Sequence, residues 1–102
     1  MINPNHNLLN HRNLKAIFKV ISQSDATSVQ KQDGTTLNKS TLILQEFGTK
    51  FENSYVCTLL GNAAICTFHP DELVYAALRF THKEHNGNVY QDITVQDIVK
   101  VK

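Results

Sequence analysis

Most of the chain alternates between apolar and polar residues, which is the pattern of half-buried β-strands. In the first such run one face would carry Leu14, Ala16, Phe18 and Val20, and the other face would carry lysines and isoleucines. Four later runs repeat the alternation: "STLILQEF", "FENSYVCTLL", "LVYAALRFTHKE" and "NVYQDITVQDIVKV". The pattern therefore predicts five strands.

Two stretches leave more than one structure open. The polar stretch "SQSDATSVQKQDGTTLNKS" predicts either a long loop or an extended hairpin, because Asp33-Gly34 readily supplies a positive φ. In "ELVYAALRF" the Ala-Ala-Leu content allows a helix, whereas the Val-Tyr and Phe-Thr content favours a strand. In the last run Asp97 interrupts the apolar face, which predicts a bulge or a bend near it.

The connections between the later strands carry clearer signals. The segment "GNAAICTFHPDE" breaks the alternation and is closed by Pro70, so we predict one or two helical turns over 62–68 and then a turn at Pro70-Asp71. Asn86-Gly87 predicts a tight type I′ turn between the last two strands, because both central positions of that turn need a positive φ.

This order of elements predicts the fold class. Five such strands cannot bury both faces as a flat sheet, whereas closure into a small barrel removes the exposed edges. We therefore predict an all-β protein, a five-stranded OB-fold barrel with a short helix between strands 3 and 4. The shared parity along each strand predicts a mostly buried core made of Leu14, Phe18, Leu42, Leu44, Cys57, Leu59, Val74, Leu78, Phe80, Ile93 and Val95. Phe47 and Phe68 are also expected in the core or at its margin.

Length and composition bound the remaining possibilities. The 102 residues suffice for one domain, which we place at 13–102 after a flexible arm at 1–12. The net charge of +1 means that any nucleic-acid site must be a local patch. Cys57 and Cys66 lie in apolar strings without a C-x-x-C pair, so we expect two buried thiols in a reducing, cytoplasmic setting. No apolar leader or membrane-spanning run is apparent.

The strand patterns also resemble a known family. The residues "STLILQEF…YVCTLLGN…DELVYAALRFTHKEHNGNVYQDITVQDIVKV" are similar to the OB-fold domain of bacterial single-stranded-DNA-binding proteins, and to a related group of small bacterial OB-fold proteins of uncharacterised function. The resemblance covers roughly residues 14–101. It implies binding of single-stranded nucleic acid, most simply DNA, with low sequence specificity, in replication, repair or mobile-element maintenance.

The chain departs from that family in its aromatic residues. It contains no Trp, and Ser54, Leu60 and His85 stand where the family tends to carry aromatic side chains. An OB-fold module that binds proteins instead of nucleic acid is therefore the alternative.

In an OB-fold the loop between strands 1 and 2 and the loop between strands 4 and 5 flank the ligand face. We expect Lys83 to meet phosphate and His85 and Tyr90 to meet bases, unless "THKEHNGNVY" is only a solvated hairpin. The full set of candidate nucleic-acid-binding residues is Lys31, Lys39, Lys50, Phe51, Tyr75, Arg79, Lys83, His85 and Tyr90.

Other chemistry has little support in the sequence. His82 and His85 would lie on opposite faces of a strand, so we expect no shared metal. The carboxylates are scattered, no Gly-rich phosphate loop is present, and neither an enzyme nor a cofactor is expected. The apolar residues of the outward parity predict a homodimer or homotetramer: Ile17, Ile21, Ile43 and Val56.

Overall fold

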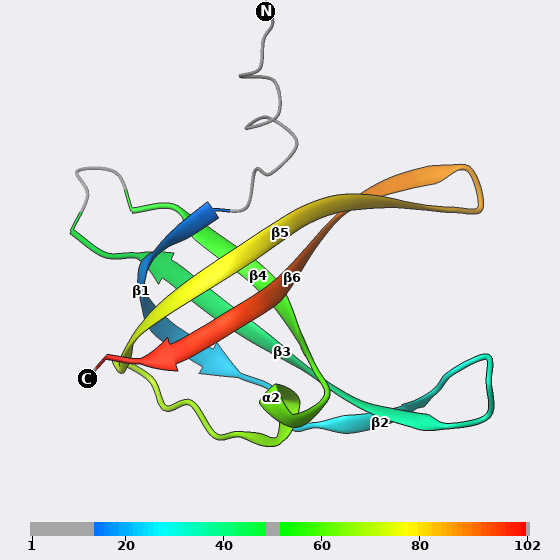
Figure 1. Cartoon of the computed structure of the whole chain (residues 1–102). Coiled ribbons are helices and arrows are strands. Elements are labelled where there is room, and N and C mark those ends of the chain that lie inside the picture. Colours follow the sequence, from blue (N-terminus) through cyan, green and yellow to red (C-terminus); the bar gives the residue numbers. More distant parts are fainter. Residues whose placement is uncertain (1–13, 49–51, 102) are drawn as a thin grey trace, which may run out of the picture.

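The computed structural model describes residues 14–48 and 52–101 (Figure 1). The predicted arm at 1–12, together with Lys50 and Phe51, lies outside the described residues. The elements are β1 (Leu14–Gln23), β2 (Thr27–Gln30), β3 (Thr36–Glu46), β4 (Ser54–Leu60), α2 (Asn62–Ile65), β5 (Leu73–His85) and β6 (Asn88–Lys100). No helix in the described ranges is long and apolar enough to cross a membrane.

The sheet closes on itself. Its strand order is β1-β5-β6-β4-β3-β2, and β3 also pairs with β1, so five strands form a ring and β2 extends the first half of β3. The β4–β6 contact is parallel and the other pairs are antiparallel. With the short helix between the third and fourth ring strands, this is the predicted OB-fold arrangement.

The structure decides between the alternatives for the two stretches whose sequence allowed more than one structure. The polar segment before β3 is an extended hairpin, in which β2 pairs with the start of β3. The helix considered for "ELVYAALRF" is wrong, because those residues lie in β5 or directly precede it. Near Asp97 the predicted irregularity is confirmed: Ala77 pairs with Asp97 and Leu78 pairs with Val95, so Gln96 is the extra residue of a bulge.

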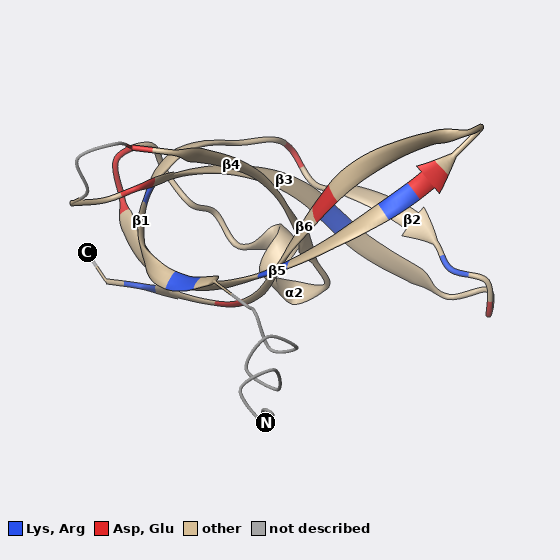
Figure 2. Ribbon diagram, turned by 90° about the horizontal axis from the view of Figure 1, so that it is seen from above, with Lys and Arg blue, Asp and Glu red and all other residues tan. Residues whose placement is uncertain are grey.

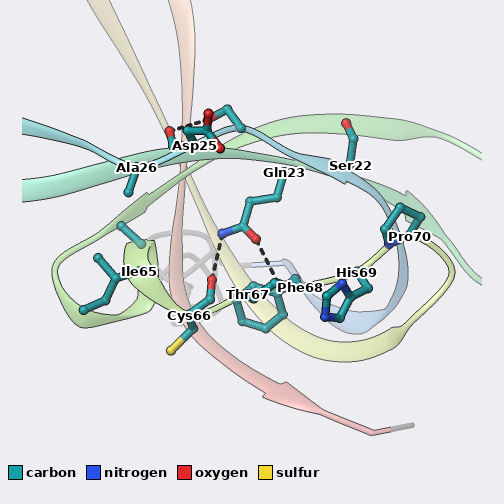
Figure 3. Close-up of a pocket in the computed structure, with 12 residues that line it drawn as sticks. Ser22, Gln23, Asp25, Ala26, Ile65, Cys66, Thr67, Phe68, His69 and Pro70 are labelled. Atoms are coloured by element: carbon teal, nitrogen blue, oxygen red, sulfur yellow. Dashed lines mark hydrogen bonds between the residues drawn. The ribbon is translucent and has the colours of Figure 1, made fainter.

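The helix α2 is shorter than predicted, because it ends at Ile65 and Cys66 already has an extended backbone. The side chain of Gln23 explains this difference (Figure 3). Its carboxamide oxygen accepts the Phe68 N–H at 2.8 Å, and its nitrogen donates to the Cys66 carbonyl at 2.9 Å. The Phe68 N–H is thereby taken from the bond to the Ala64 carbonyl that a helix reaching residue 68 would have made, and the Cys66 carbonyl gains a partner outside the helix.

The core lies inside the ring and follows the predicted parity. The largest buried side chains include Phe18, Leu42, Leu44, Leu59 and Leu78. Cys57, Val74, Val95 and Phe68 are also buried, whereas Leu14 and Ile93 are partly buried against this core.

Three residues expected inside are exposed. Phe80 has 38% of its surface exposed, since the β1–β5 ladder of the described residues reaches only to Leu78 and β5 then leaves the ring. Phe47 is exposed because β3 ends one residue before it. Cys66 is exposed because the chain becomes extended there instead of continuing the helix, so only Cys57 is the expected buried thiol.

Candidate nucleic-acid interface

Two hairpins project from the same side of the ring, one formed by β2 and β3 and the other by β5 and β6 (Figure 1). They are the connections that flank the ligand face in OB-folds. The β2–β3 hairpin lies between β1 and β3, the first and second strands of the ring, and the β5–β6 hairpin joins the fourth and fifth. The candidate residues that the structure describes can be placed against these two hairpins.

The tip of the β5–β6 hairpin has the predicted turn. Asn86 has a φ of 51° and Gly87 a φ of 81°, which is the pair of left-handed conformations of a type I′ turn. His85 pairs with Asn88 directly below the turn. The imidazole of His85 is therefore carried at the far end of the hairpin.

The tip of the β2–β3 hairpin is held by Asp33. Its carboxylate accepts the Thr35 hydroxyl at 2.6 Å and the Thr35 N–H at 3.0 Å, and these bonds lower the pKa of the Asp33 carboxyl. Lys31 donates its N–H to the Thr35 carbonyl and lies exposed at the same turn. The turn thus places one lysine next to one fixed carboxylate.

The register of the β5–β6 hairpin gathers most of the predicted contact residues. Lys83 pairs with Tyr90, and Arg79 pairs with Thr94. Residues two apart on a strand share a face, so His85, Lys83, Tyr90 and Arg79 all lie on one face of the hairpin.

That face continues onto the outer surface of the ring. Thr94 pairs with Thr58 of β4, and Thr58 pairs with Thr41 of β3, which extends the row that begins at Arg79 across four strands. Lys39 pairs with Leu60 in the neighbouring row. We call this surface, from His85 through Arg79, Thr94 and Thr58 to Thr41 and Lys39, the hairpin face.

Sequence reasoning missed the three threonines of the hairpin face. They stand on three strands that are not all consecutive in the chain, and their alignment depends on the β4–β6 contact. Nothing local in the sequence indicates that contact.

Tyr75 does not join the hairpin face. It pairs with Ile17 of β1 and with Val99 of β6, at the opposite end of β5 from the hairpin tip. The interfacial roles predicted for Lys50 and Phe51 fall outside the described residues.

Charges of both signs lie along the hairpin (Figure 2). The Lys83 Nζ is 3.8 Å from the Asp92 Oδ2, with 66% of the lysine side chain and 23% of the aspartate side chain exposed. The Asp92 carboxylate also lies 3.4 Å from the Thr81 hydroxyl. The positive potential of Lys83 is therefore partly neutralised before any ligand arrives.

An aromatic cluster is centred on Tyr55 and packs against the core. Tyr55 makes edge-to-face contacts with Phe18 and Phe80, with ring centroids 5.9 and 6.0 Å apart. The Tyr55 hydroxyl donates to the Glu46 Oε2 at 2.8 Å. Burial, followed by this carboxylate, raises the pKa of Tyr55. Tyr55 is therefore a structural residue and not a surface on which a base could stack.

A cavity of about 460 Å³ lies beside the α2 segment, between residues 22–26 and residues 64–70 (Figure 3). Gln23 lines this cavity, and its side-chain amide is already bonded to the Cys66 carbonyl and the Phe68 N–H. Within the described residues no buried side-chain polar atom lacks a partner, and no three His, Cys, Asp or Glu side chains gather as a metal site. The cavity therefore offers no buried unpaired side-chain group to a ligand.

The comparisons with known proteins agree with this fold. No family model matches the chain, and no curated protein matches it. Among solved structures, the second OB-fold domain of replication protein A from Methanococcus maripaludis is similar with a TM-score of 0.67. Its sequence is 16% identical, and the match covers 88% of this chain and 84% of that one. This similarity, to a domain of an archaeal protein, shows that the chain has the OB-fold. The resemblance to bacterial single-stranded-DNA-binding proteins stays a prediction.

Proposed function

We propose that this chain binds single-stranded nucleic acid, most simply DNA, with little sequence preference. The binding would serve replication, repair or mobile-element maintenance. The observation that carries the proposal is the hairpin face, on which strand register aligns Arg79, Lys83, His85 and Tyr90 with Lys39 between two projecting hairpins. The structural neighbour belongs to a replication protein, which supports the same class of function.

The residues of the hairpin face suit distinct contacts. Lys83, Arg79 and Lys39 supply charge for phosphates, with Lys31 at the edge, whereas the Tyr90 ring supplies a stacking surface. The threonine hydroxyls can bond to phosphate or sugar oxygens, and such contacts carry no sequence information. Few cations are available, so we expect weak binding with a shallow salt slope.

The test is fluorescence anisotropy with labelled oligo-dT at several salt concentrations. Lys83→Ala should weaken binding to all sequences alike and reduce the salt slope by about 0.7. Tyr90→Ala should cost about 1–3 kcal/mol of binding free energy without changing that slope. If the wild-type protein does not bind at low salt, or both variants bind like the wild type, nucleic-acid binding through this face is refuted.

A protein-binding module is the second candidate, and one observation favours it. Val56 is 63% exposed on the outer surface of β4, opposite the partly exposed Ile43 of β3. An apolar pair on the surface between the hairpins suits a protein partner better than a phosphate backbone. Val56→Thr separates the two candidates, because it should weaken protein docking and leave the salt slope for oligo-dT unchanged.

We also propose that the protein acts as a homodimer or homotetramer. One OB-fold with so few cations offers few contacts, and two joined copies bind one strand more strongly through effective concentration. The apolar residues on the outer strand faces support self-association, since they are costly to leave in water.

A further inference from the structure

A second surface adjoins the hairpin face on β5 and covers the outer side of β1, the first part of β5 and the end of β6. The strand register divides it into three rows of three residues. Ile17, Tyr75 and Val99 form the central row, and their side chains are 40%, 43% and 58% exposed. This three-strand surface is mostly apolar although it faces outward.

The rows on either side complete the three-strand surface. One row runs Lys15, Ala77 and Asp97, and the other runs Lys19, Leu73 and Val101. The backbones of Lys15 and Asp97 are two strand spacings apart, about 10 Å, with Ala77 between them. Neither makes an ion pair among the described residues. The surface thus carries an unpaired cation and an unpaired anion at opposite ends of one row.

We propose that a second copy of this chain docks on the three-strand surface, face to face, with the two-fold axis parallel to the strands. Rotation about this axis places each row of one copy opposite the same row of the other copy, with the β1 residue facing the β6 residue. Lys15 of one copy then faces Asp97 of the other, and the same pair forms again by symmetry. In the central row Ile17 faces Val99 and the two Tyr75 rings face each other.

The charges favour this arrangement over the one produced by a two-fold axis that also lies in the interface but runs across the strands. A two-fold axis across the strands would exchange the outer rows and bring Lys15 against Lys19, which is repulsive. With the axis along the strands, Lys19 instead faces Val101, whose side chain the lysine stem can cover while its ammonium stays in water. Charge complementarity therefore selects one orientation of the second copy.

The size of the surface sets the strength of the dimer. Three strands and five residues span about 14 Å by 17 Å. This is smaller than a standard protein interface, so we expect a dimer that dissociates in the micromolar range or above. The surface ends at Ala77, one row before Arg79, so Lys83, His85 and Tyr90 lie outside it, towards the hairpin tip. The inference specifies the oligomer of the proposed function and does not depend on nucleic-acid binding.

The experiment is sedimentation velocity of the full chain without nucleic acid, over a range of concentrations. The variants are Lys15→Glu, Asp97→Lys and the double variant, with Glu84→Lys as a charge-reversal control at an exposed residue near the tip of the β5–β6 hairpin. Circular dichroism checks that each variant is folded. Each single variant should raise the dimer dissociation constant at least about fivefold, and the double variant should restore it towards wild type.

Three results would overturn the proposal: a wild-type protein that stays monomeric at the highest concentration, a Lys15→Glu variant that dimerises more tightly, or a double variant no better than the single ones. The second result would indicate the axis across the strands. Oligo-dT binding by a protein that stays monomeric would leave the proposed function standing without this interface.

Discussion

Asp92 restrains Lys83, so removing its charge should strengthen nucleic-acid binding. Asp92→Asn keeps the size of the side chain and an oxygen for the Thr81 hydroxyl, and it removes only the negative charge 3.8 Å from the Lys83 ammonium. The variant leaves Lys83 free to neutralise a phosphate. It also removes a carboxylate that repels the strand.

The magnitude follows from distance and exposure. At this distance Coulomb's law in water gives about 1 kcal/mol. Exposed pairs are worth about 0.2–1 kcal/mol when measured, because solvent screens them and the side chains lose entropy. Releasing Lys83 should therefore raise the affinity for oligo-dT by about 1.5- to 5-fold at low salt, and steepen the salt slope by up to about 0.7.

The assay is a double-mutant cycle by fluorescence anisotropy with Asp92→Asn, Lys83→Ala and the double variant. If the two side chains are coupled, Asp92→Asn should improve binding less when Lys83 is absent. An Asp92→Asn variant with unchanged or weaker affinity would show that Lys83 does not meet phosphate. An equal gain in both backgrounds would show that Asp92 repels the strand directly and does not restrain the lysine.

Three further predictions concern the fold. Gln23→Leu should cost about 1–3 kcal/mol in the free energy of unfolding, since it leaves the Phe68 N–H and the Cys66 carbonyl without their partner; urea denaturation with an unchanged m-value checks this. Gly87→Ala should cost about 1–2 kcal/mol in the free energy of unfolding, because its φ of 81° strains an L-residue although no neighbour obstructs a Cβ; Gly87→Asn should cost less, and thermal melts of the two variants check this. Burial raises the pKa of Cys57 to about 12, so at pH 8 iodoacetamide should add once, at the exposed Cys66, and twice only after denaturation; intact-mass spectrometry showing two native adducts would contradict this.

Alternation predicted the faces of the strands because it is a local property. Successive side chains of an extended chain point to opposite sides whatever surrounds them, so Phe18, Leu42 and Leu59 could be assigned to the interior from the sequence. The turn at Asn86-Gly87 was equally local, since it depends on which residues tolerate a positive φ.

The burial predicted from this alternation was wrong for Phe80, where β5 extends beyond the ring. Phe80 has the parity of Leu78, but β5 has left the ring at that point and the ring no longer encloses its side chain. Alternation states which side a residue faces and does not state whether that side is covered. The candidate site shows the same limit: Tyr75 and Arg79 share an outward parity, yet their rows lead to different parts of the surface.

The sequence by itself determined the five strands of the ring, the side of each strand that faces inward, the tight hairpin and an irregularity near Asp97, because each depends on a few neighbouring residues. Only the tertiary structure decided that Thr94 lies beside Thr58, that Gln23 holds the Phe68 backbone, and that Lys15 and Asp97 end the same row. These contacts join residues that are remote along the chain, and they exist because the sheet closes into a ring. Closure is a property of all the strands together, so no short stretch of sequence encodes which outward side chains become neighbours.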